Sequence, residues 1–178
     1  MNAKELERLL AHLGANPSAV DVVTRKLRDA FKVSTGGRGI NAHRLSVDEV
    51  AWIVLTYAGS EIAAKAAETL ARLLDLITNE PAPAPNVPWS NDFVASFQLI
   101  LRDEIQGVRE VRVCRNVGIA EIIFDDGTVR KFVASNLAVN DAAAAGQAMF
   151  RSEGVLSGGL IEALKHRLAA DIGPESDD

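Results

Sequence analysis

The spacing of apolar and polar positions changes its period along the chain. Up to about residue 78, and again near residues 93–101, apolar side chains recur every three or four positions, which predicts amphipathic helices. Between about residues 111 and 133 they alternate with polar side chains, as in strands half-buried in a sheet. The pattern therefore predicts an α+β protein, with a helical N-terminal part and a small antiparallel sheet in the C-terminal half.

The first two predicted helices are separated by a tight turn. The first runs from about Ala3 to Leu13, and Gly14 supplies the positive φ that such a turn requires. Asn16 is expected to cap the second helix, with Pro17 at its first position. The inner face of the second helix is predicted to pack on Leu9, Leu10 and Leu13, and consists of Val20, Val23, Leu27 and Phe31.

Two further helices are predicted before residue 78. Ser46 and Glu49 form a capping box at the start of the third helix, which Gly59 ends. The fourth begins near Ser60 and keeps its helical period as far as Ile77. These two helices either complete an N-terminal core or form the interface of an oligomer, because both kinds of apolar stripe look alike in sequence.

In the C-terminal half, a helix capped by Ser90 or Asn91 is followed by a predicted three-stranded meander. Asp126-Gly127 is expected to form a two-residue hairpin turn between its last two strands. Residues 140–149 are rich in alanine and predicted to be helical, as are residues 157–170. Arginines and lysines in the meander are interpreted as its solvated face, since acidic residues lie among them.

Four of the six prolines lie between residues 81 and 88. Alternating prolines disfavour helix and stiffen the chain, so this stretch is interpreted as a linker. The predicted domains are a helix-turn-helix domain with a helical hairpin (1–78), a proline-rich linker (79–88), an α+β domain with a meander and flanking helices (89–172) and an acidic tail (173–178).

Composition narrows the classes of function. No apolar run is long enough to span a bilayer, and the charged N-terminus is unlike a secretory signal, so a cytoplasmic protein is expected. Cys114 is the only cysteine, and the three histidines are far apart, so neither a metal site nor a disulfide is expected. No cofactor motif or catalytic constellation is recognisable, and enzyme activity is therefore not expected.

Charge is distributed unevenly. Residues 1–44 contain eight basic and four acidic side chains, a formal charge of about +4, whereas the whole chain has a net charge of −5. The remainder is therefore near −9. A basic end on an acidic protein is suited to contact with a phosphate backbone.

The segment from Leu9 to Gly39 resembles the helix-turn-helix DNA-binding proteins of prophage or phage-derived type. In that pattern apolar residues lie one and five places before the turn glycine and six and nine places after it, here Leu13, Leu9, Val20 and Val23 around Gly14. Leu10 departs from it, because a small residue is common there, and this would move the helices apart or shift their register. The run KVSTGGRG, residues 32–39, is also similar to the segment that follows such helices.

The resemblance implies a cytoplasmic, oligomeric protein that recognises double-stranded DNA, as a phage-type transcription regulator does. The second helix would enter the major groove, with Arg25 and Arg28 on bases or phosphates and Ser18 near its N-terminus. The residues expected to hold the DNA backbone are Lys26, Lys32 and Arg38.

Two alternatives remain open from sequence. The order of a DNA-reading domain, a helical region and a β-containing part is similar to that of phage terminase small subunits, which would form rings rather than dimers. Short amphipathic helices around a glycine also occur in proteins that bind no nucleic acid. In that case the C-terminal domain would act as a protein-interaction adaptor.

Overall fold

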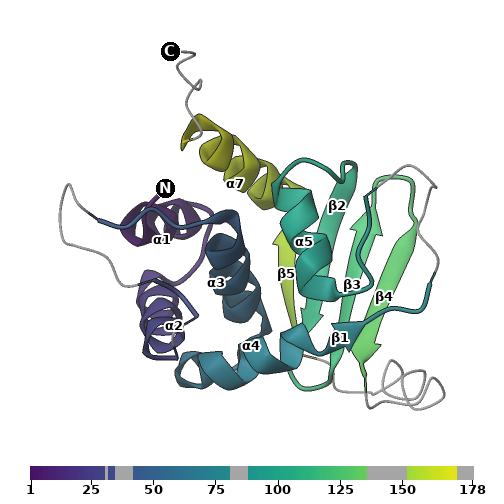
Figure 1. Ribbon diagram of the computed structural model, residues 1–178, viewed down its shortest axis with the longest axis horizontal. Coiled ribbons are helices and arrows are strands. Elements are labelled where there is room, and N and C mark those ends of the chain that lie inside the picture. Colours follow the sequence, from purple (N-terminus) through teal and green to yellow (C-terminus); the bar gives the residue numbers. More distant parts are fainter. Residues whose placement is uncertain (31, 35–41, 81–87, 136–151, 172–178) are drawn as a thin grey trace.

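The computed structural model describes residues 1–30, 32–34, 42–80, 88–135 and 152–171, which form a helical part beside an antiparallel sheet (Figure 1). In chain order the elements are α1 (Ala3–His12), α2 (Pro17–Asp29), α3 (Val47–Gly59), the 3-10 turn η2 (Ala63–Lys65), α4 (Ala66–Leu74), β1 (Leu76–Ile77), α5 (Phe93–Leu101), β2 (Val108–Cys114), β3 (Ile119–Phe124), β4 (Val129–Ala134), β5 (Glu153–Ser157) and α7 (Gly158–Asp171). The α+β class is therefore confirmed.

The predicted meander is the middle of a larger sheet. Its strands β2, β3 and β4 pair antiparallel in sequence order, and the full strand order is β1-β4-β3-β2-β5. The prediction lacked both outer strands. Leu76 and Ile77, predicted as the end of the fourth helix, pair with Ala134 and Val133 of β4.

The β3–β4 hairpin also differs from its prediction, because its loop has three residues rather than two. The N–H of Phe124 donates to the carbonyl of Thr128 at 2.9 Å, which leaves Asp125, Asp126 and Gly127 in the loop. Gly127 adopts a φ of +86°, the left-handed conformation that ends three-residue hairpin loops.

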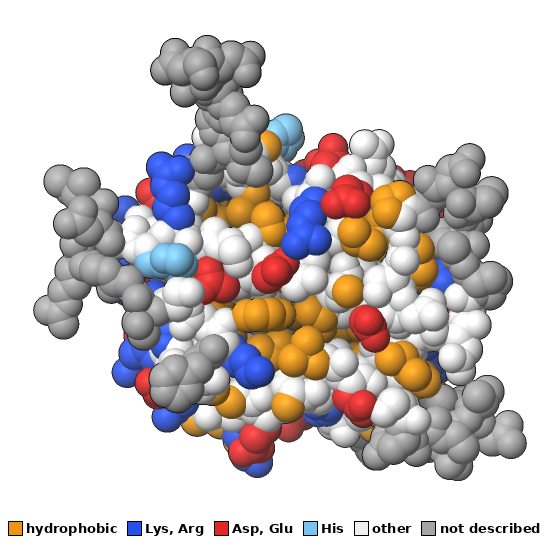
Figure 2. Space-filling view, in the orientation of Figure 1, with side chains coloured by type: hydrophobic (Ala, Val, Ile, Leu, Met, Phe, Trp, Pro, Cys, Tyr) orange, Lys and Arg blue, Asp and Glu red, His pale blue; other side chains and the backbone are white. Residues whose placement is uncertain are grey.

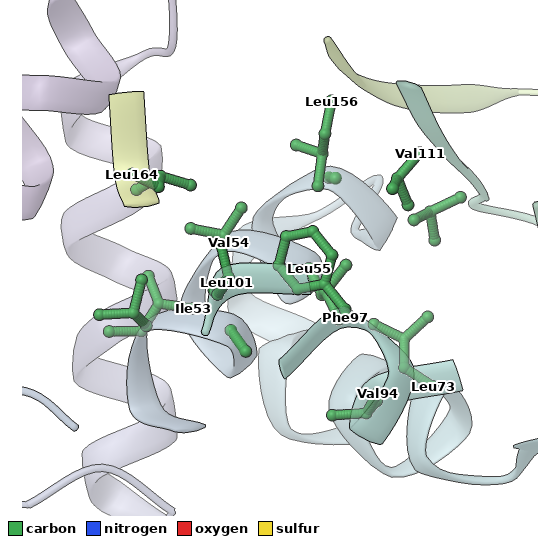
Figure 3. Packing of buried hydrophobic residues seen from close by; sticks show 14 of the residues in the cluster. Ile53, Val54, Leu55, Leu73, Val94, Phe97, Leu101, Val111, Leu156 and Leu164 are labelled. Carbon is green, nitrogen blue, oxygen red and sulfur yellow. The ribbon is translucent and has the colours of Figure 1, made fainter. Parts of the chain in front are cut away.

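Helix α3 lies at the centre of the molecule, between α1 and α2 on one side and α5 with the sheet on the other (Figure 1). Its apolar residues Ile53, Val54 and Leu55 are fully buried. Figure 3 shows them among side chains from α5, such as Phe97, and from the sheet, such as Val111. A helix that is apolar on nearly every side needs neighbours all round, and α3 has them.

The predicted division of the chain at residues 79–88 does not separate two hydrophobic cores. One cluster of buried residues runs from Leu6 in α1 through α3 to Leu164 in α7. The N–H of Thr78 donates to the carbonyl of Asn91 at 2.9 Å, so the chain before and after the proline-rich segment is adjacent. Residues before and after the segment therefore share one buried cluster.

Several predictions lie outside the described residues: the helix at 140–149, the inner-face residue Phe31, most of the glycine-rich run with Arg38, the prolines at 81–85 and the acidic tail. Within the described ranges, no helix has both the length and the apolar character needed to cross a membrane.

Candidate nucleic-acid interface

The turn between α1 and α2 has the predicted geometry. Gly14 adopts a φ of +96°, and no atom lies where a Cβ would be, so backbone conformation rather than crowding favours glycine there. The Asn16 side chain accepts hydrogen bonds from the N–H groups of Ser18 and Ala19, at 3.0 and 3.3 Å. Pro17 is the first residue of α2. These local features fix where α2 starts.

The register of α1 differs from the pattern that the resemblance implied. Its buried apolar residues are Leu6 and Leu10, while Leu9 is half-buried and Leu13 is 40% exposed. Leu10 occupies the position where a small residue is common, and its larger side chain lies in the core in place of Leu13. The expected packing of Leu13 against α2 is therefore wrong.

Helix α2 has one fully buried face. Val20, Val23 and Leu27 are at most 1% exposed, as predicted, and Thr24 is buried beside them. The hydroxyl of Thr24 donates to the carbonyl of Val20 at 2.9 Å, which satisfies this polar group within its own helix. Burial of this face fixes which side chains of α2 reach solvent.

The opposite face of α2 carries most of the residues predicted to bind DNA. Ser18 is exposed near the N-terminus, and the side chains of Arg25 and Lys26 are 62% and 48% exposed. Arg28 is less exposed than these residues because it is half-buried. Its Nε atom is buried without a hydrogen-bond partner among the described residues. Lys32 is exposed just beyond the end of the helix.

Two carboxylates share this face and neutralise part of its charge. Arg25 Nε lies 3.0 Å from Asp21 Oδ2, and Lys26 Nζ lies 3.9 Å from Asp29 Oδ2. Lys4 of α1 adds a third cation, 3.7 Å from Asp21 Oδ1. Each of these ion pairs is exposed, so each contributes less than about 1 kcal/mol and can be exchanged for a phosphate.

Lys4 was not among the residues predicted to bind DNA, although it joins this surface from the neighbouring helix. A hydrogen bond with Glu7 raises the pKa of Lys4. Burial lowers the pKa by less, and the charges of Glu7 and Asp21 raise it further. Lys4 therefore remains a cation at neutral pH. We call the group of Lys4, Ser18, Arg25, Lys26, Arg28 and Lys32 the α2 basic face.

Tyr57 of α3 connects the turn to the centre of the molecule. Its hydroxyl oxygen accepts a hydrogen bond from the backbone N–H of Asn16 at 2.9 Å. Sequence reasoning missed this contact because 41 residues separate the two and no local pattern relates them. The bond holds the start of α2 against the helix that most of the core surrounds.

The surface around the exposed side of α2 is slightly hollowed and carries cations. A shallow hollow of about 340 Å³ is lined by Val22, Arg25, Lys26, Arg28 and Asp29. In Figure 2 several Lys and Arg side chains lie along the left side, over α1 and α2, with acidic side chains among them, and others lie in the middle of the view. The surface is positive, open and built on a helix rather than a loop.

No protein-family model matches the chain, and no curated protein and no solved structure is significantly similar to it.

Arg72 and Arg115 form a second group of cations, and their hydrogen bonds show a structural role at the end of α3. Arg72 donates to the carbonyl oxygen of Gly59 at 2.9 Å, and Arg115 donates to that of Ala58 at the same distance. Both guanidinium groups thus satisfy carbonyls at the C-terminal end of α3, where positive charge is favourable. The adjoining hollow of about 320 Å³ is also lined by Glu61 and Glu68, which oppose the binding of an anion.

The third charged cluster lies between α5 and α7, where Lys165 forms ion pairs with Asp103 and Glu162. Burial lowers the pKa of Lys165, but its hydrogen bonds with Asp103 and Glu162 outweigh this effect and raise the pKa. The Nζ atom lies 2.6 Å from Asp103 and 2.8 Å from Glu162. A lysine held as a cation is a poor nucleophile. Among the described residues, no three His, Cys, Asp or Glu side chains are placed to hold a metal ion.

Proposed function

We propose that this protein binds double-stranded DNA through the α2 basic face, as a cytoplasmic transcription regulator of the phage type. The observation that carries the proposal is that α2 is buried on one face only: Val20, Val23 and Leu27 anchor it in the core, and Arg25 and Lys26 project from the other side. A major groove admits one α-helix, and a helix of 13 residues is about 20 Å long, enough to reach across several base pairs.

We assign roles to the basic residues in this proposal according to the exposure of their side chains. Arg25 and Lys26 are the most accessible cations of α2 and are assigned the main contacts with bases or phosphates. Ser18, at the N-terminal end, is a polar contact close to the groove. Lys32 and Lys4 flank the helix and would hold the sugar-phosphate backbone. Arg28 is half-buried and serves as a secondary contact.

A regulator and a terminase small subunit would share this surface and differ in assembly. A dimer that recognises two half-sites fits a regulator, and we propose this assembly. A ring would indicate the terminase alternative.

Binding to mixed genomic DNA fragments at low salt tests the proposal. The wild type is compared with the double variant Arg25→Ala/Lys26→Ala, which we expect to bind at least about tenfold more weakly because two phosphate or base contacts are lost. A matched control is Arg109→Ala/Lys131→Ala in the sheet, which removes the same charge elsewhere and should retain most of the affinity.

Two results would contradict the proposal. If the wild type binds no DNA even at low salt, DNA binding is excluded and a protein-interaction adaptor becomes the better account. If both double variants lose affinity equally, net charge rather than the α2 basic face governs binding.

A further inference from the structure

A hollow of about 160 Å³ lies where the turn between α1 and α2, the end of α3, strand β5 and the start of α7 meet. Strand β5 lies beside α3 (Figure 1). The two elements touch at Gly154, where an added Cβ would overlap the carbonyl oxygen of Ala58. The hollow is therefore bounded by several elements that are packed tightly against one another, and its shape is set by the fold.

The wall of the hollow is mainly apolar and partly open to solvent. Leu10 and Leu156 are buried in it, and Leu160 is partly buried. Leu13 and Val155, which also line it, are 40% and 52% exposed, and they are two of the five large apolar side chains exposed in the described part of the chain. Exposed apolar residues that gather at a concave site are typical of a surface that a ligand covers.

Arg115 is the one charged side chain among the described residues that line the hollow, and none of them is a carboxylate. Its Nε atom donates to the carbonyl of Ala58 at 2.9 Å. Its backbone N–H donates to the carbonyl of Ser152, and its own carbonyl accepts from Arg72. Arg115 is thus held in place, while its two terminal nitrogens donate no hydrogen bond within the described residues.

Two further observations bear on the polar groups of the hollow. Arg115 also borders the neighbouring hollow that contains Glu61 and Glu68, but it forms an ion pair with neither. The hydroxyl oxygen of Tyr57 accepts the N–H of Asn16, so its own proton is free to be donated. The hollow therefore offers hydrogen-bond donors and one positive charge beside apolar surface.

We propose that this hollow binds a small carboxylate whose apolar body is about the size of one aromatic ring. The terminal nitrogens of Arg115 form a fork that matches the two carboxylate oxygens. The ring would lie against Leu13 and Leu160 and cover them. A cavity of about 150 Å³ holds benzene, so 160 Å³ is enough for one ring.

Charge and size favour this class of ligand over others. A carboxylate carries one negative charge, and the lining supplies one positive charge to balance it. A phosphate monoester carries nearly two, so its second charge would be buried against apolar walls at a cost. The volume also excludes a folded segment or a peptide of several residues.

The hollow adjoins the element proposed to bind DNA, and only this consequence rests on the proposed function. Leu13 and Ala15 belong to the turn that leads into α2, and Tyr57 bonds to its capping residue, Asn16. A ligand in the hollow would contact this turn and is therefore placed to influence the position of α2. Binding of the carboxylate itself requires no DNA.

Titration of the isotope-labelled full chain with benzoate, followed by NMR in the absence of DNA, tests the site. We expect saturable shifts of backbone amides around the hollow, such as those of Ala15 and Gly154. Benzyl alcohol lacks the charge and acetate lacks the ring. Each should bind at least about tenfold more weakly than benzoate.

A charge placed in the hollow supplies the second test. Leu13→Glu puts a carboxylate there that competes for Arg115, and it should weaken benzoate binding by at least about tenfold. Leu74→Glu is the matched control because Leu74, in α4, is a leucine of similar exposure, 43%, and it should bind benzoate as the wild type does. Both leucines are exposed, whereas Arg115 also bonds to α3, so these variants are preferred to a change of Arg115. Circular dichroism confirms that each variant is folded.

The absence of saturable shifts, shifts confined to residues outside the hollow, or equal affinity of Leu13→Glu and Leu74→Glu would overturn the site. Equal affinities for benzoate and benzyl alcohol would overturn recognition of the carboxylate by Arg115. A protein that binds benzoate but no DNA would refute the proposed function alone, and one that binds DNA but no benzoate would refute the carboxylate site alone.

Discussion

At the scale of single residues, cations of the α2 basic face already form ion pairs with carboxylates of the same chain. Asp21 holds Arg25 and Lys4, and Asp29 holds Lys26. These carboxylates would lie close to DNA phosphates, so binding requires the cations to exchange partners while two negative charges remain nearby. We therefore expect moderate rather than maximal affinity for DNA at this surface.

Removing the two carboxylates should strengthen DNA binding. We expect Asp21→Asn/Asp29→Asn to bind about threefold more tightly or better, because repulsion is removed and weak ion pairs no longer compete. Fluorescence anisotropy with a labelled duplex measures the change. Asp125→Asn/Asp126→Asn in the β3–β4 hairpin alters the net charge equally and should have a smaller effect. An unchanged or weaker affinity for the α2 variant would count against contact between this face and DNA.

At the scale of secondary-structure elements, features set by neighbouring residues were predictable. The Asn16 cap and the Ser46–Glu49 capping box follow from spacings of two or three residues, and both form as expected. Most of the residues proposed to bind DNA could be placed on the exposed side of α2 for the same reason, because helical periodicity separates its faces.

Features that depend on distant partners were not predictable in this way. Leu76 and Ile77 continue a helical spacing, and only pairing with β4 makes them a strand. Strand β5 is too short for its alternation to stand out. The contact between Tyr57 and Asn16 and the presence of Lys4 beside Asp21 arise from helix packing, which a single sequence does not reveal.

At the start of α3, the ionisation of Glu49 makes the stability of the fold depend on pH. Burial raises the pKa of Glu49, but hydrogen bonds from the backbone N–H groups of Ser34 and Ser46, at 2.6 and 2.8 Å, outweigh this and lower it from the ordinary 4.5. A lowered pKa means that ionised Glu49 stabilises the fold above about pH 4.5 and that this contribution is lost as the pH falls through the folded-state value.

Urea denaturation at several pH values tests this role. We expect Glu49→Gln to lower the free energy of unfolding by roughly 2 kcal/mol near neutral pH, because hydrogen bonds to a charged group are lost. Its stability should also fall less than that of the wild type between about pH 5 and pH 3. Glu68→Gln, on the exposed side of α4, is the control. Parallel pH profiles for wild type and Glu49→Gln would contradict the assignment.

At the scale of the whole molecule, α3 makes the helical part and the sheet depend on each other. Its buried residues contact both, and β1 joins the sheet directly from the end of α4. Each part alone would expose a large apolar surface, so the two should unfold together. This places the α2 basic face on a rigid framework.

The two tryptophans allow that cooperativity to be measured. Trp52 lies on α3, while Trp89 packs against Phe124 and Phe132 of the sheet, with ring centroids 6.1 and 6.3 Å away. In Trp52→Phe and Trp89→Phe the remaining tryptophan reports on one side only. Within each variant, the fluorescence midpoint in urea should coincide with the circular dichroism midpoint. A separate earlier fluorescence transition on either side would instead indicate two independent units divided near residues 79–88.

If cations of α2 contact DNA phosphates, DNA binding should weaken as the salt concentration rises, because each contact releases counterions from the DNA. The logarithm of the association constant should fall linearly with the logarithm of salt concentration, with a slope of about −0.9 for each phosphate contacted. Arg25→Ala/Lys26→Ala should make that slope less steep by about 1.8 if both residues contact phosphates, while Arg109→Ala/Lys131→Ala should leave it unchanged. A slope that is the same in the wild type and in the α2 variant would contradict the account.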